Sequence, residues 1–172
     1  GLLIDVADYK HVHHGPGVSL VGHEGDYAID MGDGRPGLLY RRKREWDDDP
    51  SLDPSQTLQQ RLRTVFRLAL RACQVIEAER ALGGQIMFRT DEVELTFSDR
   101  LRTPNAPETL DALRGTIESM LAELYPDIDV AVERISEDPR RPLALRIHAP
   151  GAPSLATLLG TISDRAAVGI TT

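Results

Sequence analysis

Four of the five histidines lie near the start of the chain, at His11, His13, His14 and His23. If residues 11–13 are extended, His11 and His13 point to the same face, because side chains alternate along a strand. His23 would reach that face from a neighbouring strand, with Asp8 or Asp26 as a carboxylate ligand. Neutral imidazoles and a carboxylate suit zinc, iron or nickel, and a metal-bound water can act as a nucleophile.

No established ligand spacing such as HExxH accompanies these histidines. The alternative is therefore a polar loop of solvent-exposed imidazoles beside Gly15-Pro16-Gly17, in which the two glycines and the proline make a tight turn. The sequence leaves a divalent metal as the only cofactor to consider.

Arginines recur at helical spacing at Arg63, Arg67 and Arg71. Like charges four residues apart destabilise a helix by about 0.2–0.5 kcal/mol per pair, so another group should offset the repulsion. That group is either a bound anion or partner protein, with residues 41–44 extending the basic patch, or an internal set of carboxylates. The internal set would be Asp47 to Asp49 and Glu77, and charged helix faces of this kind are usually solvated.

A third cluster joins the end of an expected strand to the start of an expected helix, at Asp99, Arg100, Arg102 and Asn105. Backbone amides at a helix start attract anions, and arginine can bind a carboxylate or phosphate through two hydrogen bonds. The alternative is structural: Asp99 would fix a turn, and Asn105 would cap the helix.

These residues must be positioned by elements that the hydrophobic pattern predicts in the order ββββ-α-ββ-α-ββ-α. We expect strands at 2–6, 18–21, 27–31, 38–43, 86–88, 93–97, 128–134 and 143–148, and helices that begin near 53–55, 104–107 and 154. The first helix should end at Gly83-Gly84 and the second at Pro126. The run Leu2 to Val6 is typical of a largely buried strand.

Each expected helix has one apolar stripe, and each hairpin has at least one apolar face. The sequence therefore predicts an α+β fold, in which three helices pack mainly on one face of an antiparallel sheet. We expect a single domain over residues 1–172. The chain begins inside an expected strand and without a methionine, so we also expect an N-terminal segment upstream of Gly1.

Composition narrows the class of protein. The 172 residues carry a formal net charge of −7, which argues against broad nucleic-acid binding because phosphates repel a negative surface. The single cysteine, Cys73, cannot form an intrachain disulfide and falls on an apolar helix stripe, so we interpret it as a core residue of a cytoplasmic protein. No apolar run approaches the ~18–20 residues of a membrane span.

Three motifs together resemble a family of bacterial proteins that has no established activity: ADYKHV at 7–12, GPGV at 15–18 and GHEGDY at 22–27. The segments GLLY at 37–40 and DRL at 99–101 belong to the same resemblance, which covers most of the chain. The resemblance implies no activity, cofactor or catalytic residue. His13 and His14 depart from the family pattern, which reduces the metal cluster to His11 and His23.

Two functions remain open. The first is a non-catalytic cytoplasmic binding or assembly module that uses a free sheet edge or face to bind a protein partner or a second copy. The alternative is a small enzyme, either metal-dependent around Asp8, His11, His13 and His23 or acting on an anionic substrate near Asp99, Arg100 and Asn105. The sequence alone does not decide whether the chain is an enzyme.

Overall fold

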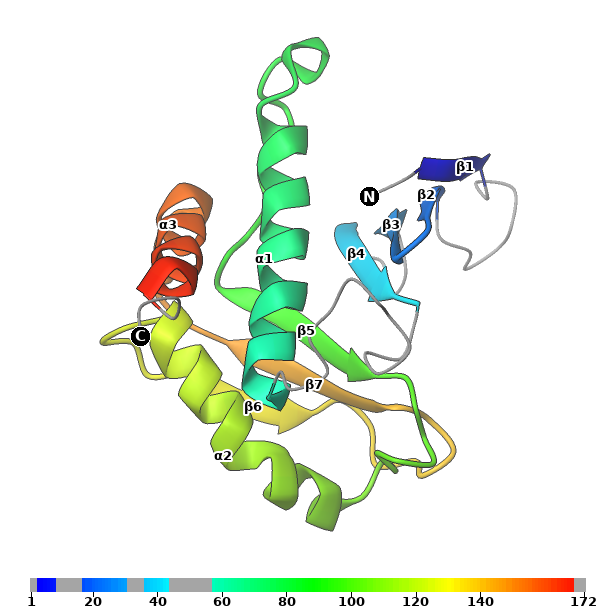
Figure 1. The fold of residues 1–172 in the computed structure, drawn as a ribbon, viewed down its shortest axis with the longest axis vertical. Coiled ribbons are helices and arrows are strands. Elements are labelled where there is room, and N and C mark those ends of the chain that lie inside the picture. Colours follow the sequence, from blue (N-terminus) through cyan, green and yellow to red (C-terminus); the bar gives the residue numbers. More distant parts are fainter. Residues whose placement is uncertain (1–2, 9–16, 31–35, 44–56, 169–172) are drawn as a thin grey trace. The chain divides into compact units, whose positions relative to one another are not determined.

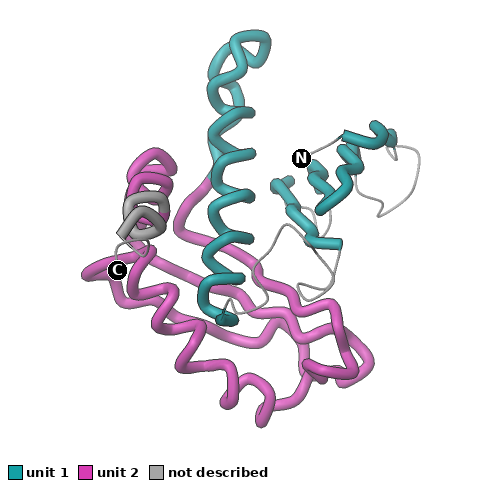
Figure 2. Tube along the Cα trace, viewed as in Figure 1, with its two compact units in different colours: residues 1–88 teal, residues 89–172 magenta. Residues whose placement is uncertain are grey.

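The computed structural model describes residues 3–8, 17–30, 36–43 and 57–168, with side chains described as far as residue 162. The chain divides into two compact units, residues 1–88 and residues 89–172 (Figure 2). The α+β class is confirmed, but the strands form two antiparallel sheets where we expected one. Each sheet belongs to one unit, because each described strand pairs with strands of the same half of the chain. The single domain over residues 1–172 stays a prediction.

Unit 1 contains a four-stranded meander and one long helix (Figure 1). Its strands are β1 (Leu3–Asp8), β2 (Val18–Gly22), β3 (Gly25–Asp30) and β4 (Gly37–Arg42), paired in chain order. The helix α1 (Leu58–Glu77) lies against β4. Strand β1 is therefore an edge strand that pairs, in the described part of the chain, only with β2.

One row of side chains crosses all four strands of this sheet. Val6 lies opposite Leu20, Leu20 opposite Tyr27, and Tyr27 opposite Tyr40. The rings of the two tyrosines are 4.7 Å apart between centroids. Tyr40 also occupies the space beside Gly25, where an added Cβ would meet the tyrosine ring at 2.8 Å. A glycine is needed at this position because no larger residue leaves room for that ring.

The helix α1 begins at a capping box, in which the Thr57 side chain and the Gln60 backbone amide are hydrogen-bonded and the Gln60 side chain bonds back to Thr57. Leu62 and Phe66 are the buried members of its predicted stripe. The helix ends earlier than expected, at Glu77. A short 3-10 helix, η3 (Arg80–Leu82), then leads to Gly83 and Gly84, whose φ angles of 55° and 74° are left-handed.

The strand expected at 86–88 is wrong, because these residues form no regular structure. The Phe88 amide donates to the Glu77 carboxylate (2.7 Å), so it is not available to a β ladder. Met87 is 83% exposed, which is incompatible with the buried hairpin strand that its type suggested.

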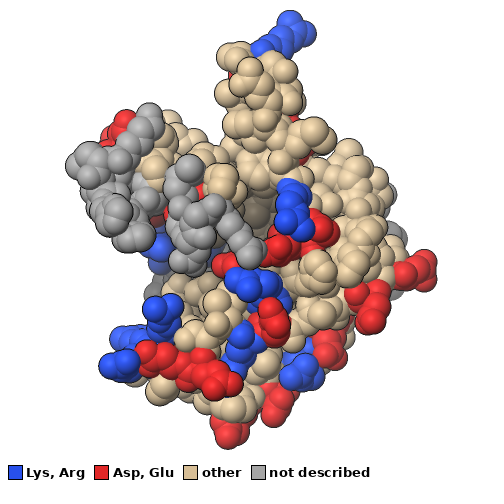
Figure 3. Space-filling model, turned by 180° about the vertical axis from the view of Figure 1, so that it is seen from behind, with Lys and Arg blue, Asp and Glu red and all other residues tan. Residues whose placement is uncertain are grey.

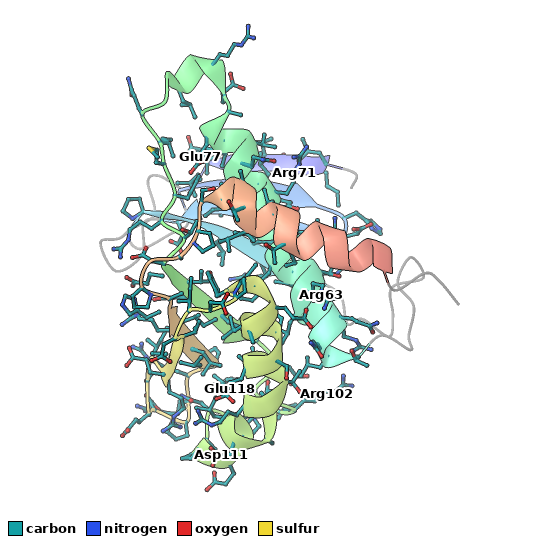
Figure 4. The ribbon with its side chains drawn as sticks, turned by 90° about the vertical axis from the view of Figure 1, so that its left-hand side faces the viewer. Arg63, Arg71, Glu77, Arg102, Asp111 and Glu118 are labelled. Carbon is teal, nitrogen blue, oxygen red and sulfur yellow. The ribbon has the colours of Figure 1, made fainter. Side chains whose placement is uncertain are left out.

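Unit 2 has the order β5 (Glu92–Phe97), α2 (Pro107–Leu124), β6 (Ala131–Arg134), β7 (Leu143–His148) and α3 (Leu155–Val168). Its sheet has the order β5-β7-β6, with β7 antiparallel to both neighbours. Helices α2 and α3 lie on one side of this sheet (Figures 1 and 4). Leu143, Leu145 and Ile147 of β7 are completely buried, so the core of this unit lies between the sheet and the two helices.

Candidate functional site

The predicted metal ligands are only partly within the described chain. His11 and His13 lie outside the described residues, as does His14. Asp8 pairs with Val18 at one end of the β1–β2 ladder, whereas His23 follows Gly22 at the other end. Four residues of strand separate these ends by about 13 Å, so Asp8 and His23 do not ligate one ion together. A metal site that combines His11 or His13 with either Asp8 or His23 stays a prediction.

The other carboxylate considered for such a site, Asp26, is engaged locally. It accepts a hydrogen bond from the Gly22 amide (3.3 Å) and pairs with Lys43 (2.8 Å). No group of three His, Cys, Asp or Glu residues within the described ranges is placed to hold a metal ion.

The arginine stripe does lie on one helix, and Figure 4 shows Arg63 and Arg71 along α1. The Arg71 guanidinium hydrogen-bonds the side-chain carbonyl of Gln74. Arg67 is exposed, and its charge partly offsets the rise in the Tyr27 pKa that burial causes. Glu77 bonds the Phe88 amide (2.7 Å), and Asp47 to Asp49 lie outside the described residues. The three arginines therefore lie on one helix, and their role as a basic patch stays a prediction.

The predicted cluster at the end of β5 is brought against a second loop that the sequence did not single out. We call residues 98–106 and 135–142 together the arginine loops. Asp99 does fix a turn: its carboxylate accepts from the amides of Leu101 (3.0 Å) and Arg102 (3.1 Å). The Arg100 guanidinium donates to the backbone carbonyl of Arg140. This contact places Arg140 and Arg141 beside the predicted residues.

Asn105 is not the helix cap that we expected. The N-cap of α2 is Ala106, which has no side-chain capping bond. Asn105 is 4% exposed, and its amide nitrogen donates to the backbone carbonyls of Ser136 (2.9 Å) and Asp138 (3.0 Å). Its side-chain oxygen is buried without a partner in the described chain. An oxygen acceptor in this position needs a donor and does not favour an anion, so the role of Asn105 is to join the two loops.

A surface that sequence reasoning missed lies on β1. Leu3, Ile4 and Val6 are 59%, 60% and 55% exposed, and Leu20 of the neighbouring strand is 43% exposed. We call these four side chains the β1 patch. The buried strand expected here is wrong, because more than half of the Leu3, Ile4 and Val6 surface is in water. An apolar run together with two aspartates, Asp5 and Asp8, was the available signal for an edge position.

The open face of the sheet in unit 2 carries charged side chains that form ion pairs with one another. Arg146 of β7 lies between Glu94 of β5 and Glu133 of β6, at 3.1 Å and 4.0 Å, and is 3.7 Å from Glu92. Figure 3, the view from behind Figure 1, shows basic and acidic side chains side by side on this face. Arg146 and its three glutamate partners lie on the solvent-exposed face that the alternating pattern of β5 predicted. Their ion pairs form within the chain.

No protein-family model, curated protein or solved structure matches this chain. In the described ranges, none of the helices has the length and apolar character that crossing a lipid bilayer requires.

Proposed function

We propose that this chain is a non-catalytic protein-binding module that docks a partner protein on the β1 patch. The observation that supports this proposal is the exposure of Leu3, Ile4 and Val6, each with more than half of its surface in water. Val6 and Leu20 are direct cross-strand neighbours, and neighbouring exposed apolar side chains mark interaction surfaces, whereas scattered ones are normal. Burying the exposed half of such a side chain contributes about 1 kcal/mol, so the patch supplies part of the binding energy and the remaining contacts of the partner must supply the rest.

The partner contacts the side chains of β1 and does not extend the sheet. The register of β1 on β2 shifts between Leu3 and Asp5, and such an irregularity distorts the edge. The Val6 amide donates to the Asp5 carboxylate (2.8 Å) and is not available to another strand. Bulges and charged side chains are the features by which natural edge strands avoid strand pairing.

Charge argues for a different protein as the occupant and against a second copy. Asp5 and Asp8 lie within the same strand as the patch. A contact between two copies would bring together two surfaces that both carry these carboxylates, which is unfavourable because like charges repel. A partner that presents apolar side chains flanked by Lys or Arg matches both the apolar surface and its charge.

We place this module in the cytoplasm. One cysteine cannot form an intrachain disulfide, and burial raises the pKa of the Cys73 thiol to about 12. A thiol that stays protonated is a poor nucleophile and suits a structural role in a reducing compartment.

Photocrosslinking in the native cells tests the proposal. A photoreactive amino acid replaces Ile4 in the patch or, as a matched control, Val75, which is 59% exposed on α1 of the same unit. We expect a covalent product from position 4 alone, in which mass spectrometry places the bond in an apolar segment flanked by Lys or Arg. A covalent homodimer, an acidic crosslinked segment, the same product from both positions, or no product would overturn the proposal.

A further inference from the structure

We infer that the arginine loops of unit 2 form a second binding surface, which takes an acidic, partly apolar segment of another protein. The most exposed large apolar side chain in the described part of the chain is Leu101, at 96%. It stands between Arg100 and Arg102 at the turn fixed by Asp99. A single exposed leucine is common on protein surfaces, but a leucine between two cations fits a ligand that is both acidic and apolar.

The two loops are held together before any ligand binds. Asn105 bridges them through Ser136 and Asp138, at 2.9 Å and 3.0 Å, and Arg100 contacts the backbone of Arg140. Loops fixed in this way lose little conformational entropy on binding, which favours affinity.

The charges on these loops are not fully balanced. Arg102 lies 3.7 Å from Asp99, and Arg140 lies 3.0 Å from Asp138, so each has a carboxylate partner. Arg100 and Arg141 form no ion pair with a carboxylate of the described chain. The charge of Arg141 lowers the pKa of Asp138, but the two loops contain four arginines and three carboxylates, so a net positive charge remains for the carboxylates of a ligand. Such a site raises both association rate and specificity.

An acidic protein segment fits these loops better than a nucleic acid does. Neither loop contains an aromatic residue on which a base could stack, although stacking supports most binding of single strands. Asp99, Glu137 and Asp138 interrupt the arginines and would repel a continuous row of phosphates. A peptide can place its carboxylates at Arg100 and Arg141 and an apolar side chain at Leu101.

Fluorescence polarisation of the full chain tests this inference with three labelled probes: a peptide of Glu-Glu-Leu repeats, poly-glutamate of equal length, and single-stranded oligothymidine. We expect the Glu-Glu-Leu peptide to bind most tightly and its affinity to fall with added salt. Arg100→Glu/Arg141→Glu should weaken this binding about tenfold or more, because two attractive charges become repulsive. Leu101→Ser should weaken it about fivefold and bring it to the level of poly-glutamate.

The control is Arg114→Glu, the same charge reversal on the exposed side of α2, where Arg114 pairs with Asp111 and Glu118 at 3.6 Å each. It should leave peptide binding within about twofold of the original. If Arg100→Glu perturbs folding, the Arg141→Glu single variant replaces the double variant, because circular dichroism should show no change for it. Equal losses in the control, tighter binding of oligothymidine, or no effect of either loop variant would overturn the inference.

This surface is independent of the β1 patch, because no residue is shared between them. Failure of the peptide experiment would leave the proposed docking on β1 intact, and failure of crosslinking at position 4 would leave the arginine loops intact.

Discussion

The Arg100 guanidinium donates a hydrogen bond to the backbone carbonyl of Arg140, forty residues further along the chain. This bond joins the loop after β5 to the loop between β6 and β7. The bond brings arginines that are far apart in the sequence onto one surface. Only the first of the two loops was recognisable from the sequence as a candidate binding site.

Asn105→Ala should destabilise unit 2. The variant removes two hydrogen bonds to the carbonyls of Ser136 and Asp138 at a position that is 4% exposed. Leaving partly buried carbonyls without a donor costs about 1 kcal/mol or more. Urea denaturation followed by circular dichroism would measure this loss, and an unchanged midpoint would show that water replaces the amide at no cost.

Gly25→Ala should destabilise the sheet of unit 1. Its Cβ would lie 2.7 Å from the Arg41 carbonyl oxygen and 2.8 Å from the Tyr40 ring. Overpacking of this kind costs about 1–3 kcal/mol. Gly37→Ala on β4 is the matched control, because its Cβ meets nothing within 4 Å and should leave thermal stability nearly unchanged. Equal melting temperatures for the two variants would contradict the close approach of Tyr40.

Cys73 should react slowly with iodoacetamide in the folded chain. Burial raises its thiol pKa from 9.0 to about 12, with a smaller contribution from Glu77. The thiolate is the reactive form, so at pH 8 the native rate should be about a thousandfold below that in urea. Mass spectrometry of the alkylated chain would give both rates, and a native rate close to the unfolded one would show that the thiol is not shielded.

The ion pair between Asp138 and Arg140 should make stability depend on acid pH. Hydrogen bonds from the Arg140 side chain hold the Asp138 pKa below its usual 3.8. A depressed folded pKa contributes stability above the unfolded pKa, and that contribution is lost as the pH falls through the folded value. The difference in urea midpoint between the original chain and Arg140→Gln should therefore be present at pH 6 and shrink toward pH 3. A difference that stays constant over this range would exclude the linkage.

Alkaline pH should weaken unit 2 through Tyr125. Burial raises its pKa from 10.0 to about 12, and its hydroxyl donates to the Thr90 carbonyl (3.0 Å). Because the folded pKa is raised, this contribution is complete below pH 10 and is lost as the pH rises toward 12. Tyr125→Phe should reduce that loss, as thermal unfolding at pH 8 and pH 11 would reveal. An equal loss of thermal stability at pH 11 in the original chain and in Tyr125→Phe would assign that loss to other groups.

The sequence predicted most elements because their signals are local. The apolar stripe that includes Leu62 and Phe66 marked α1, and the alternation of Val93, Leu95 and Phe97 marked the sheet strand β5. The strand expected at 86–88 failed for a tertiary reason, since the Phe88 amide is bonded by a carboxylate from α1. The division into two sheets depends on which strands pair, and hydrophobic periodicity does not carry that information.

The candidate sites show the same limit. Residue type identified Arg100 and Asn105, but their partners Arg140 and Ser136 lie in a loop that is adjacent only after folding. Asn105 looked like a cap because asparagine is common at helix starts. The run Leu2 to Val6 was interpreted as a buried strand because an apolar run has the same composition in a central strand as in an edge strand.

The most direct test of docking on β1 is isothermal titration calorimetry with the purified partner that crosslinks at position 4. Ile4→Ser/Val6→Ser removes two half-exposed apolar side chains and should weaken binding about thirtyfold, corresponding to about 2 kcal/mol. Val75→Ser, at an equally exposed position on α1, should bind like the original chain. Equal affinities for all three chains would contradict the proposal that β1 is the docking surface.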